Sequence, residues 1–328
     1  MQQQRLRSLS DILYAGPCQV NATAEQAERT AEAFCKELGI YLPNLSEYNT
    51  MSAYLFPHTS YERLFAIIVL NNLLFYIDDQ MDRNDAEGNV PNEIEQRRMF
   101  DQIVRIFKTG QVNDSQDRLQ VSAKAIRDLF LPLSDPRWLK RLIENTEKHL
   151  KATTYDSGVQ SNRTGRNLVE HYIAVRDHDS GMVPTVDLIE FASNIYLPDE
   201  VLTHPVLQEA MLECTRVAGL MNDIFSYHRE CVVMGSDFNL VAVSKHAFGL
   251  SFERALDYSI GVINENLESF LAKEANLPSF DDESIDALIH DYYQGLKDQI
   301  IAAWHWQLSG TNRYRSPESP FEEMRHML

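Results

Sequence analysis

Residues 222–230 read Asn-Asp-Ile-Phe-Ser-Tyr-His-Arg-Glu, and this stretch carries more information than any other part of the chain. Asn222, Ser226 and Glu230 are four residues apart, so on a helix they lie above one another on one face. All three side chains offer oxygen, the ligand that a hard divalent cation such as Mg²⁺ prefers. The trio spans about 12 Å along a helix, and the long glutamate can reach back toward the N-terminus. The stretch therefore predicts a metal site on a helix.

A second acidic cluster, Asp78-Asp79-Gln80-Met81-Asp82, directly follows an apolar run at 65–77. Asp78 and Asp82 share one helix face, and like charges at this spacing weaken a helix by a few tenths of a kcal/mol. A bound cation would remove that repulsion. Taken alone, the cluster fits a solvated helix end equally well, but together with the triad it favours a second metal-binding segment.

Composition and charge narrow the class of protein. The chain has 328 residues, of which 44% are hydrophobic and 24% are charged, as in ordinary soluble globular proteins. We find no linker, repeat or low-complexity stretch, and we therefore expect one domain over residues 1–328. A net charge of −18 argues against nucleic acid or an anionic membrane surface as a partner.

The cysteines and the apolar runs indicate a cytoplasmic protein. Four cysteines show no metal-ligand spacing and no dense disulfide pattern, so we expect reduced and mostly buried thiols. The N-terminal residues lack the hydrophobic region of a signal peptide, and no apolar run is long enough to span a membrane. We therefore expect no membrane anchor.

Helical periodicity recurs along the chain, and residues such as Gly39 and Gly310 end the periodic segments. Gly181 and Pro184 interrupt one of them. The acidic run at 281–286 follows Pro278-Ser279, where it is expected to cap a helix rather than bind a metal. We predict an all-α fold with about ten helices, at residues 21–38, 60–81, 91–108, 115–133, 137–154, 165–177, 185–194, 205–231, 251–275 and 281–308.

At these residues the chain resembles the microbial, single-domain class I terpene synthases. In that family an aspartate-rich motif and an Asn/Ser/Glu triad face each other across the mouth of a helical bundle with a central active-site cavity. Together they bind three Mg²⁺ ions and the diphosphate of a linear isoprenoid. The resemblance implies that Asp78 is the principal aspartate ligand and that Asp82 assists it. It further implies that Asn222, Ser226 and Glu230 hold the other ion.

The same resemblance assigns residues around the helix break. Arg176 lies upstream of Asn222 at the spacing of the family's diphosphate-sensing arginine. Asp179 and Ser180 look like the family's linker and effector, the latter turning a backbone carbonyl toward the substrate. Without the triad, Arg176 would be interpreted as a surface ion pair. Asp179 and Ser180 fit simple turn residues equally well.

Further residues match the family's diphosphate-binding positions. Arg229 occupies the basic position within the triad motif, which is more often lysine. Arg313 and Tyr314, in a C-terminal segment at 311–328, resemble the pair that closes over the diphosphate, although the dipeptide alone is common. The segment Asn239-Leu240-Val241 resembles the one that follows the triad. The N-terminal segment, residues 1–20, lacks the proline-rich opening common in bacterial members.

Helix faces suggest residues that line the cavity. Phe75 and Asn71 precede Asp78 by one and two turns, so both are expected below the metals. Of the two tryptophans at 304 and 306, only one can readily face inward, and we favour Trp304. Core packing is an equally good explanation for Phe75 and Trp304. Small residues below Asn222 suggest a roomy wall, namely Thr215, Ala218 and Gly219.

These assignments predict a lyase that ionises a prenyl diphosphate with Mg²⁺ and cyclises the cation to a terpene hydrocarbon or alcohol. Farnesyl diphosphate is the first choice of substrate and geranylgeranyl diphosphate the second. The nearest alternative is a chain-elongating isoprenyl diphosphate synthase, although such enzymes carry two aspartate-rich motifs. A non-enzymatic acidic helical scaffold, or an inactive relic of a cyclase, is the other alternative. A homodimer would be usual for such proteins.

Overall fold

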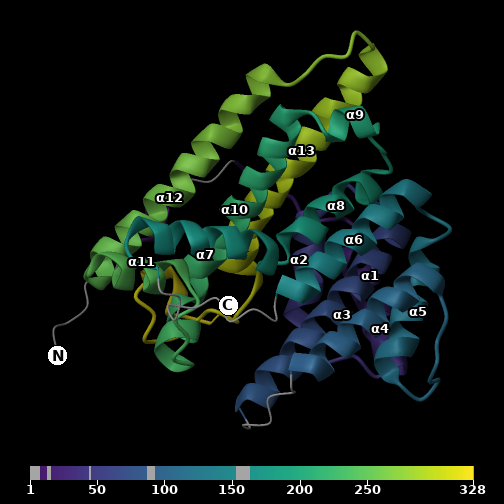
Figure 1. Ribbon diagram of the computed structural model, residues 1–328, viewed down its shortest axis with the longest axis horizontal. Coiled ribbons are helices and arrows are strands. Elements are labelled where there is room, and N and C mark those ends of the chain that lie inside the picture. Colours follow the sequence, from purple (N-terminus) through teal and green to yellow (C-terminus); the bar gives the residue numbers. More distant parts are fainter. Residues whose placement is uncertain (1–7, 13–15, 44–45, 87–92, 153–162, 328) are drawn as a thin grey trace. The chain divides into compact units, whose positions relative to one another are not determined.

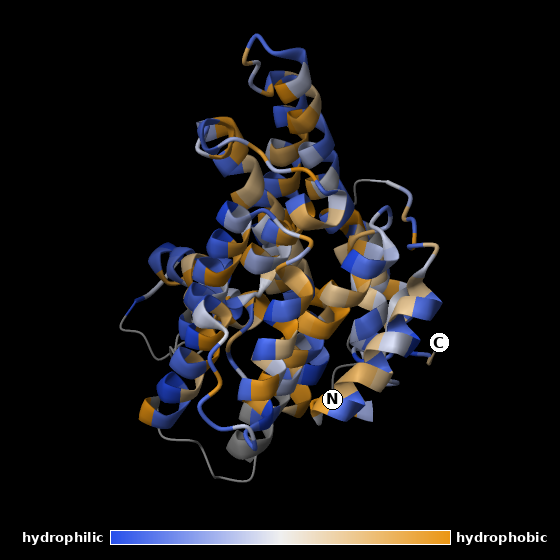
Figure 2. Cartoon of the chain, turned by 90° about the vertical axis from the view of Figure 1, so that its right-hand side faces the viewer, coloured by the Kyte–Doolittle hydropathy of each residue, from blue (hydrophilic) through white to orange (hydrophobic). Residues whose placement is uncertain are grey.

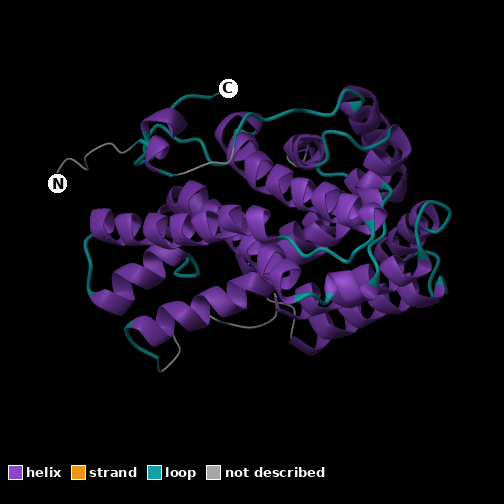
Figure 3. Cartoon of the chain, turned by 90° about the horizontal axis from the view of Figure 1, so that it is seen from above, coloured by secondary structure: helices purple, strands orange, loops and turns teal. Residues whose placement is uncertain are grey.

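The computed structural model describes residues 8–12, 16–43, 46–86, 93–152 and 163–327. Within these ranges the chain forms helices joined by loops, and no extended strand occurs (Figure 3). The predicted all-α fold is therefore confirmed. Most helices carry both apolar and polar residues (Figure 2), the pattern of helices that bury one face and expose the other.

The chain divides into two compact units, which are described separately. One unit comprises Gln19–Tyr155 and Val183–Tyr196. Its helices (Figure 1) are α1 (Ala24–Leu38), α2 (Ser46–Leu55), α3 (Tyr61–Ala86), α4 (Glu93–Thr109), α5 (Arg118–Phe130), α6 (Pro136–Ala152) and nearly all of α8 (Met182–Ser193). Helix α3 packs against α1, α2 and α5, while α4 packs against α5 and α6. Because the middle of α3 is apolar on every side and fully buried around Ile67, it forms the core of this unit.

A polar cluster joins α6 to α8 within the same unit. Arg141 forms ion pairs with Asp187 and Glu190, whose side chains are almost completely buried, and it also donates a hydrogen bond to Glu190. Asn145 donates a hydrogen bond to Asp187 Oδ2 at 2.6 Å. Burial raises the pKa of Asp187 to about 6, although Asn145 and Arg141 oppose the shift. The ion pairs and hydrogen bonds of this cluster therefore replace the contacts with water that the charged groups lose when the helices pack.

The second unit comprises Met1–Cys18, Asp156–Met182 and Leu197–Leu328. Its helices are α7 (Arg166–Asp179), α9 (Asp199–Leu202), α10 (Pro205–Tyr227), α11 (Leu240–Phe248), α12 (Phe252–Ala272) and α13 (Glu283–His305). Helix α10 packs against α7, α12 and α13, and α11 packs against α7 and α12. Helix α10 is thus the element to which most of this unit is attached.

The observed helix bounds correct several expectations. The long segments expected at 205–231 and 281–308 each change from α-helix to π-helix, at His228–Val233 and at Trp306–Gly310. Helix α8 begins at Met182 rather than at 185, because proline is tolerated in the first turn of a helix. Helices α2 and α11 were not expected. Asp282 caps α13 by accepting hydrogen bonds from the backbone nitrogens of residues 284 and 285, as the sequence indicated.

Two expectations, about thiols and about membrane-spanning helices, can be compared with the structure. All four cysteines are free; Cys35 and Cys214 are buried, whereas Cys18 and Cys231 are partly exposed. No helix among the described residues has the length and apolar character needed to cross a membrane. The single-domain organisation over residues 1–328 stays a prediction.

Candidate metal and diphosphate site

The triad lies at the C-terminal end of α10, where the helix widens. Ser226 is fully buried, and its hydroxyl donates a hydrogen bond to Glu230 Oε2 at 2.8 Å. Glu230 belongs to the π-helical turn rather than to a regular α-helix, which corrects the expected geometry. Single π-turns within α-helices often occur at functional sites. Ser226 and Glu230 therefore present two oxygens close enough to share one cation.

Arg176, near the end of α7, holds three oxygen-bearing side chains. Its Nε donates to Asp223 Oδ1 at 3.0 Å, and its Nη2 donates to Asn222 Oδ1 at 3.2 Å. Its Nη1 donates to Asp179 Oδ2 at 3.3 Å. Burial alone would lower the pKa of Arg176, but Asp223 and the neighbouring Tyr172, Asp179 and Glu230 together outweigh it and raise that pKa. Three predicted site residues, Arg176, Asn222 and Asp179, are thus directly connected.

Asp223 is the central acceptor of this network, and the sequence analysis missed it. Its carboxylate also accepts from the Tyr172 hydroxyl at 2.5 Å and from the Leu240 backbone nitrogen at 2.9 Å. Burial raises the pKa of Asp223 to about 6, while Arg176 and Tyr172 oppose the shift. Asp223 is rotated by about 100° from the triad face, which is why the spacing of the triad did not reveal it. A charged residue within the largely apolar stretch at 217–225 was the available signal.

The amide of Asn222 connects α10 to the C-terminal end of the chain. Its Nδ2 donates to Gln307 Oε1 at 2.8 Å and to the Tyr314 hydroxyl oxygen at 2.9 Å. Tyr314 is buried, and burial raises its pKa. The structure therefore brings Tyr314 to the triad, and its role at the diphosphate stays a prediction. Gln307 was missed, since nothing in its neighbourhood in the sequence marks it.

Asn239 ties the segment after the triad back to α10. It is fully buried and caps α11. Its Nδ2 donates to the Asp223 carbonyl oxygen at 2.8 Å and lies 3.4 Å from Glu230 Oε2. The position of Glu230 is therefore defined from both sides, by Ser226 and by Asn239.

The helix break between α7 and α8 is in close contact with α10. Gly181 has a φ of +71°, a left-handed conformation that glycine adopts without steric cost. A Cβ placed on Gly219 would lie 3.0 Å from Ser180 Cβ and 3.2 Å from its Oγ. The expected roomy wall is therefore wrong at Gly219, where the small residue accommodates Ser180.

For the remaining basic and aromatic candidates, the structure gives the burial of the side chains and the ring contacts of the two tryptophans. Arg229 and Arg313 are half-buried. Trp304 is buried against Phe225 in an edge-to-face contact of 5.6 Å between ring centroids. Trp306 is buried as well, against Tyr314 at 6.3 Å. Both tryptophans thus contribute to packing, which corrects the expectation that only one of them faces inward.

The aspartate-rich segment belongs to the other unit. Asp78 is an exposed residue of α3, and Asp82 follows on the same helix, with its side chain outside the described residues. Phe75 stacks on Tyr48 with 3.6 Å between ring centroids, so a packing role is shown. The metal role of the aspartates and the cavity role of Phe75 stay predictions.

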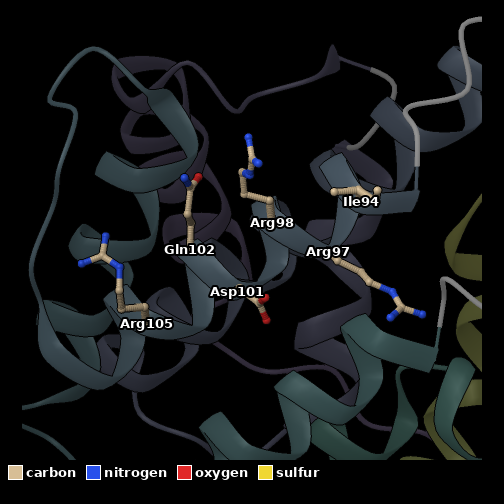
Figure 4. Close-up of a pocket in the computed structure, with 6 residues that line it drawn as sticks. All are labelled: Ile94, Arg97, Arg98, Asp101, Gln102 and Arg105. Carbon is tan, nitrogen blue, oxygen red and sulfur yellow. The ribbon is translucent and has the colours of Figure 1, made fainter.

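Outside this site, the described residues form a hollow but no cluster of three or more His, Cys, Asp or Glu side chains that could hold a metal. A shallow hollow of about 430 Å³ lies along α4, lined by Ile94, Arg97, Arg98, Asp101, Gln102 and Arg105. Figure 4 shows Arg97 and Arg105 pointing in opposite directions, so the arginines do not converge on one point. The hollow contains none of the predicted site residues.

Comparison with known proteins shows the family of this chain. The family model described as terpene synthase family 2, C-terminal metal binding, matches residues 70–269, more than half of the chain. The chain belongs to the terpene synthase family. The matched region includes both Asp78 and the triad. The family predicted from the sequence, and its use of a divalent metal, are therefore confirmed.

Individual relatives of this terpene synthase are microbial. Sesquiterpene synthase 3 of Postia placenta is 31% identical over 252 residues, which cover 76% of this chain and 65% of that protein. The chain thus spans slightly less than two thirds of that relative. The 10-epi-cubebol synthase of Sorangium cellulosum is 28% identical over 285 residues, covering 85% of this chain and 86% of that protein.

The solved structures show the same fold. A variant of cucumene synthase superimposes with a TM-score of 0.79 and 20% sequence identity, covering 92% of this chain and 99% of that one. The predicted helical bundle of the class I isoprenoid synthases is therefore confirmed.

Proposed function

We propose that this terpene synthase ionises a linear prenyl diphosphate and cyclises the resulting cation to a terpene hydrocarbon or alcohol, releasing diphosphate. This makes it a carbon–oxygen lyase acting on phosphates. The observation that supports the proposal most directly is the contact of Arg176 with Asn222 beside the Ser226–Glu230 pair. The proposed diphosphate-binding Arg176 and the proposed oxygen ligands are thus adjacent within one unit.

The donor set at the triad fits Mg²⁺. An amide oxygen, a hydroxyl and a carboxylate are hard ligands, and Mg²⁺ is usually bound by few protein groups plus water and substrate phosphate. We therefore propose that Asn222, Ser226 and Glu230 hold Mg²⁺, with Asp78 and Asp82 as the second segment and three ions in total. When bound, Mg²⁺ neutralises the charge that develops on the departing diphosphate.

Protein groups supply the remaining stabilisation of the leaving group. We propose that Arg176, Arg229, Arg313 and the Tyr314 hydroxyl bind the diphosphate oxygens, as charge-assisted donors do for anions. Arg176 has a second task, because its present partners include Asp179, at the end of α7 next to the helix break. A guanidinium drawn toward the diphosphate would pull on Asp179 and so move Ser180.

The hydrocarbon part of the substrate needs a dry site, since water would quench a carbocation. We propose that the segment at 311–328 closes over the diphosphate and that Phe75 and Trp304 line the cavity. Aromatic faces attract cations through their ring quadrupole. The name of the Postia relative, a sesquiterpene synthase, supports farnesyl diphosphate as the first substrate, ahead of geranylgeranyl diphosphate.

The test is incubation of purified protein with C10, C15 and C20 prenyl diphosphates, with Mg²⁺ or with EDTA, followed by gas chromatography–mass spectrometry. We expect a cyclic product from the C15 substrate only when Mg²⁺ is present. Longer prenyl diphosphates that form only with added isopentenyl diphosphate would instead identify an elongating transferase. Absence of any Mg²⁺-dependent product would contradict the proposal.

A cytoplasmic location and a homodimer remain part of the proposal. Size-exclusion chromatography with light scattering tests the second, and a mass near 37.7 kDa would contradict it by indicating a monomer.

A further inference from the structure

The side chain of Gln307 contacts a proposed metal ligand, Asn222, and both of its own polar atoms are hydrogen-bonded to protein groups. It is 2% exposed and lies in the π-helical turn that follows α13. Its Nε2 donates to the Ala303 carbonyl oxygen at 2.8 Å, and its Oε1 accepts from Asn222 Nδ2, also at 2.8 Å. We propose that Gln307 is a positioning residue that fixes the amide orientation of Asn222, so that the oxygen rather than the nitrogen faces the metal.

The orientation of an asparagine matters at a metal site because the two ends of its amide are nearly identical in shape. Only Oδ1 has lone pairs that can ligate a cation; the NH₂ group is a donor. A half-turn of the amide would place that NH₂ group toward Mg²⁺ and would remove Asn222 from the ligand set. The inference therefore rests on the proposed function of Asn222.

Two fixed groups at the ends of a short hydrogen-bonded chain set this orientation. The Ala303 carbonyl can only accept, so Gln307 must present its Nε2 to Ala303 and its Oε1 to Asn222. At the other end the Arg176 guanidinium can only donate, so it requires Asn222 Oδ1. Turning either amide over would create a donor–donor or an acceptor–acceptor contact at both of its ends.

Tyr314 cannot replace Gln307 in this role. Its hydroxyl also accepts from Asn222 Nδ2, at 2.9 Å, but a hydroxyl can equally donate. It would therefore satisfy either orientation of the Asn222 amide. When Arg176 turns toward a diphosphate, Gln307 is the remaining partner that distinguishes the two orientations.

The test measures binding of Mn²⁺, as a probe of the Mg²⁺ site, by electron paramagnetic resonance with and without inorganic diphosphate. All proteins carry Asp78→Asn and Asp82→Asn, so that the triad dominates the signal. Gln307→Met keeps the length of the side chain but removes its polar atoms. We expect it to weaken Mn²⁺ binding about tenfold or more, the usual effect of losing a group that orients a ligand.

Two matched variants separate positioning from general damage. Gln307→Glu keeps an oxygen facing Asn222 and, when protonated, still donates to Ala303, so it should recover most of the affinity. Gln299→Met removes a buried amide from α13 about two turns earlier and should leave Mn²⁺ binding unchanged. Equal losses in Gln299→Met and Gln307→Met would overturn the inference. Circular dichroism establishes that each variant is folded.

The decisive comparison uses Asn222→Asp, because a carboxylate has two equivalent oxygens and needs no orienting partner. In that background Gln307→Met should weaken Mn²⁺ binding much less than it does beside asparagine. The same loss in both backgrounds would show that Gln307 acts through packing alone, contrary to the inference. If the Gln307-containing parent binds no Mn²⁺, with or without diphosphate, the proposed metal site fails instead.

Discussion

The contact between Gly219 and Ser180 provides a test of the helix break, because its effect on the free energy of unfolding can be calculated from the structure. In Gly219→Ala the new Cβ would lie 3.0 Å from Ser180 Cβ, closer than ordinary van der Waals contact, which begins at 3.4 Å. Overpacking of this kind costs about 1–3 kcal/mol. Alanine in place of a helical glycine stabilises by about 1 kcal/mol, so the net change in the free energy of unfolding should lie between roughly zero and −2 kcal/mol.

Gly261 supplies the matched control. It lies within α12, and a Cβ added there meets nothing within 4 Å. Gly261→Ala should therefore show the gain of about 1 kcal/mol without the clash. The difference between the two variants in urea-induced unfolding then measures the contact with Ser180 alone. We expect it to be about 1–3 kcal/mol.

The same contact predicts an effect on catalysis. The new Cβ must push Ser180 by a few tenths of an ångström, so turnover of farnesyl diphosphate should fall in Gly219→Ala and not in Gly261→Ala. Adding Ser180→Gly removes the clashing atoms and should restore the stability of Gly219→Ala. Equal unfolding free energies for the two alanine variants would refute the reasoning, as would a Ser180→Gly change that restores nothing.

Four further predictions concern the site and the core. Glu230→Asp shortens the side chain that contacts Ser226, so turnover should fall about tenfold or more while the circular dichroism spectrum is kept; unchanged turnover would remove Glu230 from the metal site. Arg176→Lys replaces a planar fork by a single ammonium, and turnover should fall on the order of a hundredfold, whereas equal rates would exclude the sensor role. Phe75→Ala should redistribute the products seen by gas chromatography, and an identical profile would place Phe75 away from the substrate. Burial raises the pKa of Asp187 to about 6 in the folded protein, from an ordinary value of 3.8. Its contribution to the free energy of unfolding is therefore present below about pH 4 and is lost as the pH rises to 6. Asp187→Asn should flatten this part of the pH profile of urea unfolding, and an unchanged slope would contradict the shift.

Much of the fold could be predicted from the sequence because helix signals are local. The apolar run before Asp78 and the capping residue Asp282 indicated helices that the structure contains. The two π-helical turns were not predictable in this way. They add a residue to a turn without changing the local composition, and only packing against neighbouring helices selects them.

In the candidate site too, local spacing could be read from the sequence, whereas contacts between distant segments could not. The spacing of Asn222, Ser226 and Glu230 predicted a metal-binding face, because residues four apart on a helix must lie on one side, and the resemblance of the motif indicated the family. The amino-acid sequence says nothing of which buried groups meet from distant segments. Only the tertiary structure placed Asp223 against Arg176 and Gln307 against Asn222, because these hydrogen bonds join helices separated by up to 85 residues in the chain. The proposed ligands could be chosen from local geometry, whereas the groups that hold them are defined by the packing of α7, α10 and α13.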